Sequence, residues 1–94
     1  MRHPSPIAKV LDQLLRNLGI ERPVKEHMAI TLWQEAVGAQ IAAVATPMRV
    51  RDGILFVRVG SSVWRNELLF HKGMIIAKLN RLIGKSVVED IRFQ

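Results

Sequence analysis

The stretch from Met48 to Leu69 contains the feature that most constrains the fold, a tight turn at Asp52-Gly53. Apolar residues alternate with other residues on both sides of this turn. An Asp-Gly pair flanked by such alternation is the strongest short-range signal for a β-hairpin. We therefore predict two antiparallel strands joined by a two-residue turn, followed directly by a helix.

A two-residue turn determines which residues of the two strands face each other. The expected pairs are Arg51 with Ile54, Val50 with Leu55, Arg49 with Phe56, and Met48 with Val57. One face then carries only apolar side chains: Met48, Val50, Leu55, Val57 and Val59. The other face carries three arginines and two apolar residues: Arg49, Arg51, Arg58, Ile54 and Phe56. This second face is either a surface for nucleic acid or the solvated side of a half-buried sheet.

The rest of the chain predicts helices around this hairpin. Apolar spacing and capping residues indicate a helix from the Ser5-Pro6 start to Gly19, a turn at residues 21–23, and a second helix over about residues 24–44. Gly38 within the second helix either permits close packing or marks a break. A third helix should run from Ser61 or Ser62 to Gly84, with a strand over residues 86–93. On this strand we place Val87, Ile91 and Phe93 on one face and Val88, Asp90 and Arg92 on the other.

This order, α-α-β-β-α-β, predicts an α+β fold in which helices cover one face of a small three-stranded sheet. Ninety-four residues correspond to one domain, with residues 1–4 as a disordered tail. Within the first helix, Ile7 begins an apolar stripe that ends at Leu18. Such a stripe is typical of a helix packed on the core, but it can also dock on another protein.

The charge is concentrated in the second half of the chain. Residues 48–94 contain nine Lys or Arg and four Asp or Glu, whereas the overall net charge is +6. Clustered arginine in a basic domain is the electrostatic signature of nucleic-acid binding.

Several chemistries find no support in the sequence. There is no cysteine, and His3, His27 and His71 have no metal-ligand spacing, so we predict no metal and no cofactor. No phosphate-binding glycine motif occurs. We therefore expect neither an enzyme nor a small-molecule substrate. No signal peptide or membrane span is evident, so the expected location is the cytoplasm, in association with the nucleoid.

One anion site remains possible where the hairpin enters the third helix. The Gly60-Ser61-Ser62 segment would present backbone N–H groups at a helix N-terminus, with Arg58 and Arg65 beside it. The alternative is that a serine caps the helix itself.

The chain also resembles a known family along nearly its whole length, about residues 7–93. The segments that carry the resemblance are Trp33-x-x-x-Val37-Gly38, Ile41-Ala42, Thr46-Pro47, Gly53-x-Leu55-x-Val57-x-Val59, Ser61-Ser62-x-Trp64-x-x-Glu67-Leu68, Leu79-Asn80-x-x-Ile83-Gly84 and Ile91-Arg92-Phe93. In this order they are similar to the signature of the DciA family. The resemblance implies a KH-like domain of a bacterial protein that assists the loading of the replicative helicase onto DNA.

Two departures from that pattern matter. The G-x-x-G loop with which KH domains clamp nucleic acid is absent at residues 19–23. Many family members also carry a basic tail after this domain, so contacts made by a tail are not expected from residues 1–94. We therefore assign the predicted nucleic-acid contacts to other residues: Arg49, Arg51, Arg58, Arg92, Phe56, Arg65, Ser61 and Ser62. We assign structural roles to Trp33, Gly38, Trp64 and Leu68.

The predicted function is thus a non-enzymatic accessory that binds the hexameric replicative helicase and single-stranded DNA, with RNA also possible. One alternative is a general single-stranded RNA- or DNA-binding module unconnected to replication. A second is a structural adaptor between proteins, in which the leucine-striped first helix docks and the arginines stay solvated.

Overall fold

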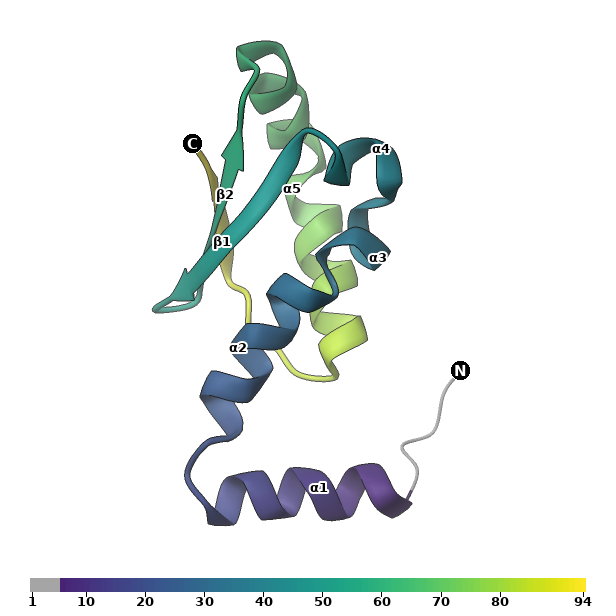
Figure 1. The fold of residues 1–94 in the computed structure, drawn as a ribbon, viewed down its shortest axis with the longest axis vertical. Coiled ribbons are helices and arrows are strands. Elements are labelled where there is room, and N and C mark those ends of the chain that lie inside the picture. The colour runs from purple at the N-terminus through teal and green to yellow at the C-terminus, as the bar shows by residue number, and fades with distance from the viewer. Residues whose placement is uncertain (1–5) are drawn as a thin grey trace.

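The computed structural model describes residues 6–94, and Figure 1 shows their arrangement. The elements are α1 (Pro6–Asn17), α2 (Glu21–Thr31), α3 (Trp33–Val37), α4 (Ala39–Ala42), β1 (Ala45–Arg51), β2 (Ile54–Val59), α5 (Ser62–Ile83) and β3 (Asp90–Phe93). The predicted α+β class is confirmed, and so is the order, except that the second helix is divided into three. The predicted tail and the Ser5 helix cap lie outside the described residues.

The strands form one mixed sheet in the order β1-β2-β3. β1 and β2 are antiparallel, and β3 lies parallel to β2 on its other side. Asp52 and Gly53 have φ angles of 52° and 79°, the positive values that a tight hairpin turn of this kind requires at both central residues. The predicted pairs of Arg51 with Ile54, Val50 with Leu55 and Arg49 with Phe56 are all present.

The predicted pairing of Met48 with Val57 is wrong, because a β-bulge intervenes. Pro47 pairs with Val57, and Met48 is the extra residue between Pro47 and Arg49. The Met48 side chain is 41% exposed instead of lying on the core face. Proline has no N–H to donate to the ladder, and irregular pairing beside it is therefore common. β1 consequently begins earlier than predicted, at the buried Ala45.

The predicted helix over residues 24–44 is also wrong in its extent. α2 starts at Glu21, so the predicted turn at residues 21–23 is the first helical turn, where Pro23 removes no needed N–H. The chain then breaks at Leu32 and again at Gly38. Gly38 has φ 87° and ψ 163°, and nothing lies within 4 Å of where its Cβ would be. Gly38 therefore marks a break and does not permit close packing.

The last strand is shorter than predicted because a side chain holds the preceding loop. Asn80 Oδ1 accepts hydrogen bonds from the N–H groups of Val87 and Val88, and Asn80 Nδ2 donates to the carbonyl of Val88. Residues 86–89 are thereby kept out of the sheet, and β3 begins at Asp90. Val88 was predicted on the outer face, but it is 2% exposed and belongs to the core.

The core lies between the sheet and the helices on one side of it (Figure 1). Leu55 and Val57 of β2 and Ile91 of β3 are fully buried there, as is Leu68 of α5. Trp33 is 2% exposed, and its Nε1 donates a hydrogen bond to the carbonyl of Ala45 over 3.0 Å. This bond ties the start of α3 to the start of β1. Trp64 is half-buried against the same cluster.

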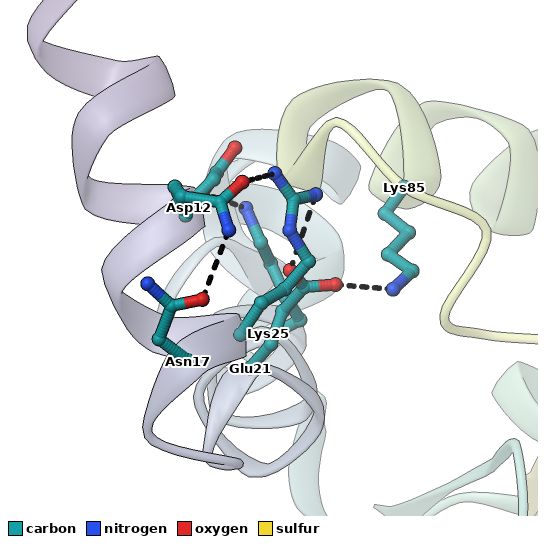
Figure 2. A network of polar contacts seen from close by, with 7 residues as sticks. Asp12, Asn17, Glu21, Lys25 and Lys85 are labelled. Atoms are coloured by element: carbon teal, nitrogen blue, oxygen red, sulfur yellow. Dashed lines mark hydrogen bonds and ion pairs between the residues drawn. The ribbon is translucent and has the colours of Figure 1, made fainter.

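α1 does not take part in this core. None of its residues is buried, so the prediction that its stripe packs on the core is wrong. Polar contacts fix the helix instead, as Figure 2 shows. Asp12 pairs with Lys25 over 3.0 Å, and Glu21 pairs with both Arg16 and Lys85. Figure 1 shows α1 at one end of the molecule, set apart from the sheet.

We expect Gly38→Ala to lower the free energy of unfolding by about 1–3 kcal/mol, because an alanine is strained at a positive φ with ψ near 160°. Gly73→Ala is the matched control, since Gly73 lies inside α5 with open space around its Cβ position. It should stabilise the protein by about 0.5–1 kcal/mol. Urea denaturation measures both, and a stabilising Gly38→Ala would contradict this account of the break.

Candidate nucleic-acid interface

The outer face of the sheet carries most of the predicted nucleic-acid contacts. The pairing of the strands places the following side chains on this one face: Thr46, Arg49, Arg51, Ile54, Phe56, Arg58, Asp90 and Arg92. We call this set the arginine face. It draws on all three strands, and the helices α2 to α5 lie on the other side of the sheet (Figure 1). The four predicted phosphate-binding arginines and Phe56 are therefore brought together.

The four arginines of this face are available to solvent. Arg49, Arg51, Arg58 and Arg92 are all exposed. Among residues 6–94, none of them takes part in an ion pair, whereas Arg16, Lys25, Lys72 and Lys85 all do. Four guanidinium groups without ion pairs on one face of the sheet create a positive potential that attracts phosphate groups.

Arg49 and Phe56 are in contact with each other. The guanidinium carbon of Arg49 lies 4.4 Å from the centre of the Phe56 ring, which is a cation–π distance. The two residues are directly opposite on β1 and β2, so the hairpin register creates the contact. Bases of single-stranded nucleic acid stack on aromatic rings and also on guanidinium planes. The pair therefore offers a guanidinium plane with an aromatic ring beneath it.

The strand residues contribute one carboxylate to this face, Asp90. Lys72 of α5 donates a hydrogen bond to Asp90 Oδ1 over 3.0 Å. This bond lowers the pKa of the Asp90 carboxyl below its ordinary value. A depressed folded-state pKa contributes stability above the ordinary aspartate pKa of about 3.9, and the contribution is lost as the pH falls through the folded-state value. Near neutral pH the carboxylate is thus paired with a cation from outside the face.

The start of α5 lies beyond the end of β2 and is engaged in local contacts. Ser61 Oγ accepts a hydrogen bond from the N–H of Trp64 over 3.3 Å. Arg65 donates to the carbonyl of Val59 over 2.7 Å. Of the two alternatives predicted for this segment, the structure contains the helix cap, and the capping residue is Ser61. The next residue, Ser62, is exposed. These three residues are not part of the arginine face, and their predicted contact with nucleic acid stays a prediction.

A second group of cations lies around a pocket of about 260 Å³ between the start of α2 and the loop after α5. Arg22, Lys25 and Lys85 line it. Each of them is paired with a carboxylate, that of Glu26, Asp12 and Glu21 respectively. The positive charge is therefore balanced within the protein. Lys85 and Glu21 are 64 positions apart, so local spacing could not have predicted that pair, whereas Arg22 and Glu26 have the i,i+4 spacing of a helical ion pair.

Residues 6–94 contain no group of three His, Cys, Asp or Glu side chains placed to hold a metal ion. Within the same range, no helix combines the length and apolarity needed to cross a membrane.

Comparison with known proteins identifies the family. A model of the family described as "Dna[CI] antecedent, DciA" matches residues 6–93. The chain belongs to the DciA family. The segments that carried the resemblance in the sequence lie within this match, including the buried Trp33 and Leu68.

Curated relatives of this DciA-family chain include UPF0232 proteins of Mycobacterium and Rhodococcus species. The chain is 32% identical over 91 residues to the UPF0232 protein of Mycobacterium ulcerans, which covers 97% of this chain and 49% of the relative. The protein of Rhodococcus jostii is 33% identical, with 97% and 48% covered. That of Mycobacterium tuberculosis H37Rv is 32% identical over 92 residues, with 98% and 49% covered. The chain therefore spans about half the length of these curated relatives, and their names state no activity.

The contact between Arg49 and Phe56 predicts unequal effects of two neighbouring substitutions. Arg49→Ala should lower the free energy of unfolding by about 0.5–1 kcal/mol, because it removes the cation–π contact. Arg51→Ala removes an equally charged and exposed side chain from the same strand and should stay within about 0.5 kcal/mol of the parent. Urea denaturation of the two variants makes the comparison. Equal effects would show that the stack contributes no stability.

Proposed function

We propose that this protein is a non-enzymatic accessory of the bacterial replicative helicase that holds single-stranded DNA on its arginine face. The observation that carries the proposal is the open outer face of the sheet, on which Arg49, Arg51, Arg58 and Arg92 are exposed and free of ion pairs with the described residues. Membership of the DciA family supports the connection with helicase loading.

The form of the arginine face favours a single strand over a duplex. Phosphate groups can contact the arginines that surround the Arg49–Phe56 stack, and an unpaired base can lie against the stack itself. In a duplex the bases are already stacked within the helix, so that second contact is lost. The face also takes the place of the G-x-x-G clamp, which this chain lacks.

In this proposal the protein contributes binding energy to the loading of the helicase onto DNA. An accessory that binds the helicase through one surface and the strand through another raises the population of complexes in which the helicase already lies on DNA. ATP hydrolysis is then left to the helicase. This division of labour agrees with the lack of a phosphate-binding glycine motif in the sequence.

The test of the DNA site compares two triple variants with the same net charge. In the first, Arg49, Arg51 and Arg58 are changed to Ala, which removes three cations from the arginine face. In the control, Lys9, Lys78 and Arg81 are changed to Ala, which removes three exposed cations from α1 and α5. Fluorescence anisotropy of a labelled single strand, measured over a salt series, gives the affinity and its salt slope.

We expect the log–log salt slope of the arginine-face variant to be less negative by about 2, since each lost phosphate contact contributes about 0.7. That change corresponds to a loss of affinity on the order of 50-fold at roughly 0.15 M salt. The control should keep nearly the parent slope. Equal losses in the two variants would mean that only the net charge matters, and an unchanged slope in the first would disprove the site.

The helicase arm is tested by co-purification of the tagged chain with the replicative helicase. We expect a complex at micromolar concentrations, both for the parent and for the arginine-face variant, because the two surfaces are separate in the proposal. If DNA binding persists but no helicase complex forms, the protein is a general single-strand-binding module. If the helicase complex forms without any DNA binding, it is a protein–protein adaptor.

A further inference from the structure

A stripe of exposed aliphatic side chains runs along α1 and on to Leu18, just after the end of the helix. Five residues form it, and their exposed fractions run from 49% to 72%: Ile7, Val10, Leu11, Leu14 and Leu18. Scattered exposed leucines are ordinary, but a contiguous apolar surface of this kind marks an interaction site. We call this set the α1 stripe.

Contacts on the opposite side of the helix leave most of the α1 stripe exposed to solvent. Asp12 and Arg16 lie on the opposite side of the helix and pair with Lys25 and Glu21 of α2. Figure 2 shows these pairs between α1 and its neighbours. Below the helix, a mostly apolar groove of about 430 Å³ separates Leu11 and Leu15 from the body of the protein. The helix is therefore anchored by charges, while Leu11 borders the groove and Ile7, Val10, Leu14 and Leu18 are exposed to solvent.

The order of apolar residues along this stripe is symmetric about a point one residue beyond the midpoint of α1. Counting outward from the point between Asp12 and Gln13, apolar positions recur at equal distances on both sides. The symmetric pairs are Leu11 with Leu14, Val10 with Leu15, and Ile7 with Leu18. An antiparallel second copy of the helix would therefore set apolar side chains opposite apolar side chains along the whole stripe. Such self-complementarity is what a two-fold symmetric interface requires.

The distribution of charge also makes the α1 stripe a surface on which a second copy of the chain can bind. The chain has a net charge of +6, so most of its surfaces repel an identical chain. The α1 stripe has an uncharged border on one side, where Gln13 Nε2 donates to Asn17 Oδ1 over 2.9 Å. On the other side the border is Ala8 and Leu15. The charged residues Lys9 and Arg16 project from the opposite side of the helix. Two stripes can thus meet without bringing like charges together.

We propose that the α1 stripe is a homodimer interface, in which the helix of one copy packs antiparallel on that of another. A helix of 12 residues is about 18 Å long, so the contact is small and the dimer reversible. The arginine face lies on the sheet, away from α1 (Figure 1), and stays open in both copies.

Sedimentation velocity over about 1 to 100 μM tests the proposal with the 94-residue chain. We expect the parent to shift from monomer towards dimer, and Leu11→Asp with Leu14→Asp to stay monomeric at every concentration. The matched control is Phe70→Asp, which places a charge on an 84% exposed apolar residue of α5. It should dimerise like the parent. Because α1 has no buried residue, circular dichroism should show the rest of the fold intact in all variants.

Cysteine cross-linking tests the antiparallel geometry, since the chain has no cysteine of its own. Around the proposed two-fold axis, Leu14 of the two copies is offset by about 5 Å along the helix and Leu18 by about 16 Å. Oxidation should therefore link Leu14→Cys chains to each other but not Leu18→Cys chains. A mixture of Ile7→Cys and Leu18→Cys chains should link across the pair.

Three results would overturn the proposal. One is a parent that stays monomeric at 100 μM, which would leave the stripe to a different partner. Another is a dimer that survives the α1 variant but is lost in Phe70→Asp. The third is self-linking of Leu18→Cys chains, which requires parallel helices. None of these results depends on DNA or on the helicase, so the function proposed above is tested separately.

Discussion

The alternation of side chains along β2 is the constraint on which the structure depends. Leu55, Val57 and Val59 are at most 2% exposed, while Ile54, Phe56 and Arg58 between them point the other way. β2 is also the central strand, so its register fixes both neighbours. A slip of one residue would turn arginines into the core and leucine and valine out of it. The register of β2 therefore determines both which side chains are buried in the core and which are exposed on the arginine face.

The parts of the fold that were predictable from sequence are those set by neighbours along the chain. The turn at Asp52-Gly53 and the pairing of the next three positions depend only on local backbone preferences and period-two alternation. The same information places Arg49 and Arg51 beside Phe56, and so most of the arginine face. Arg92 joins that face only because β3 returns to β2 from the far end of α5.

The predictions from sequence were wrong where contacts between residues far apart in the chain determine the local structure. Periodicity alone favours one long helix through Gly38, but the bond from Trp33 to Ala45 requires the chain to turn back towards the sheet. The extent of β3 depends on Asn80, whose side chain replaces strand pairing for Val87 and Val88. The helix α1 has the amphipathic pattern of a core helix, and only its ion pairs with α2 show that it is held by charge.

The bulge at Met48 has a further consequence for how copies of this chain can meet. β1 is an edge strand, and an edge normally offers a row of free backbone groups on which another chain can add a strand. Here Pro47 removes one donor and the bulge interrupts the spacing of the rest. The exposed Arg49 and Arg51 would repel an identical edge. β1 is thus poorly suited to sheet extension, and this protects the protein from aggregation through its own β-structure.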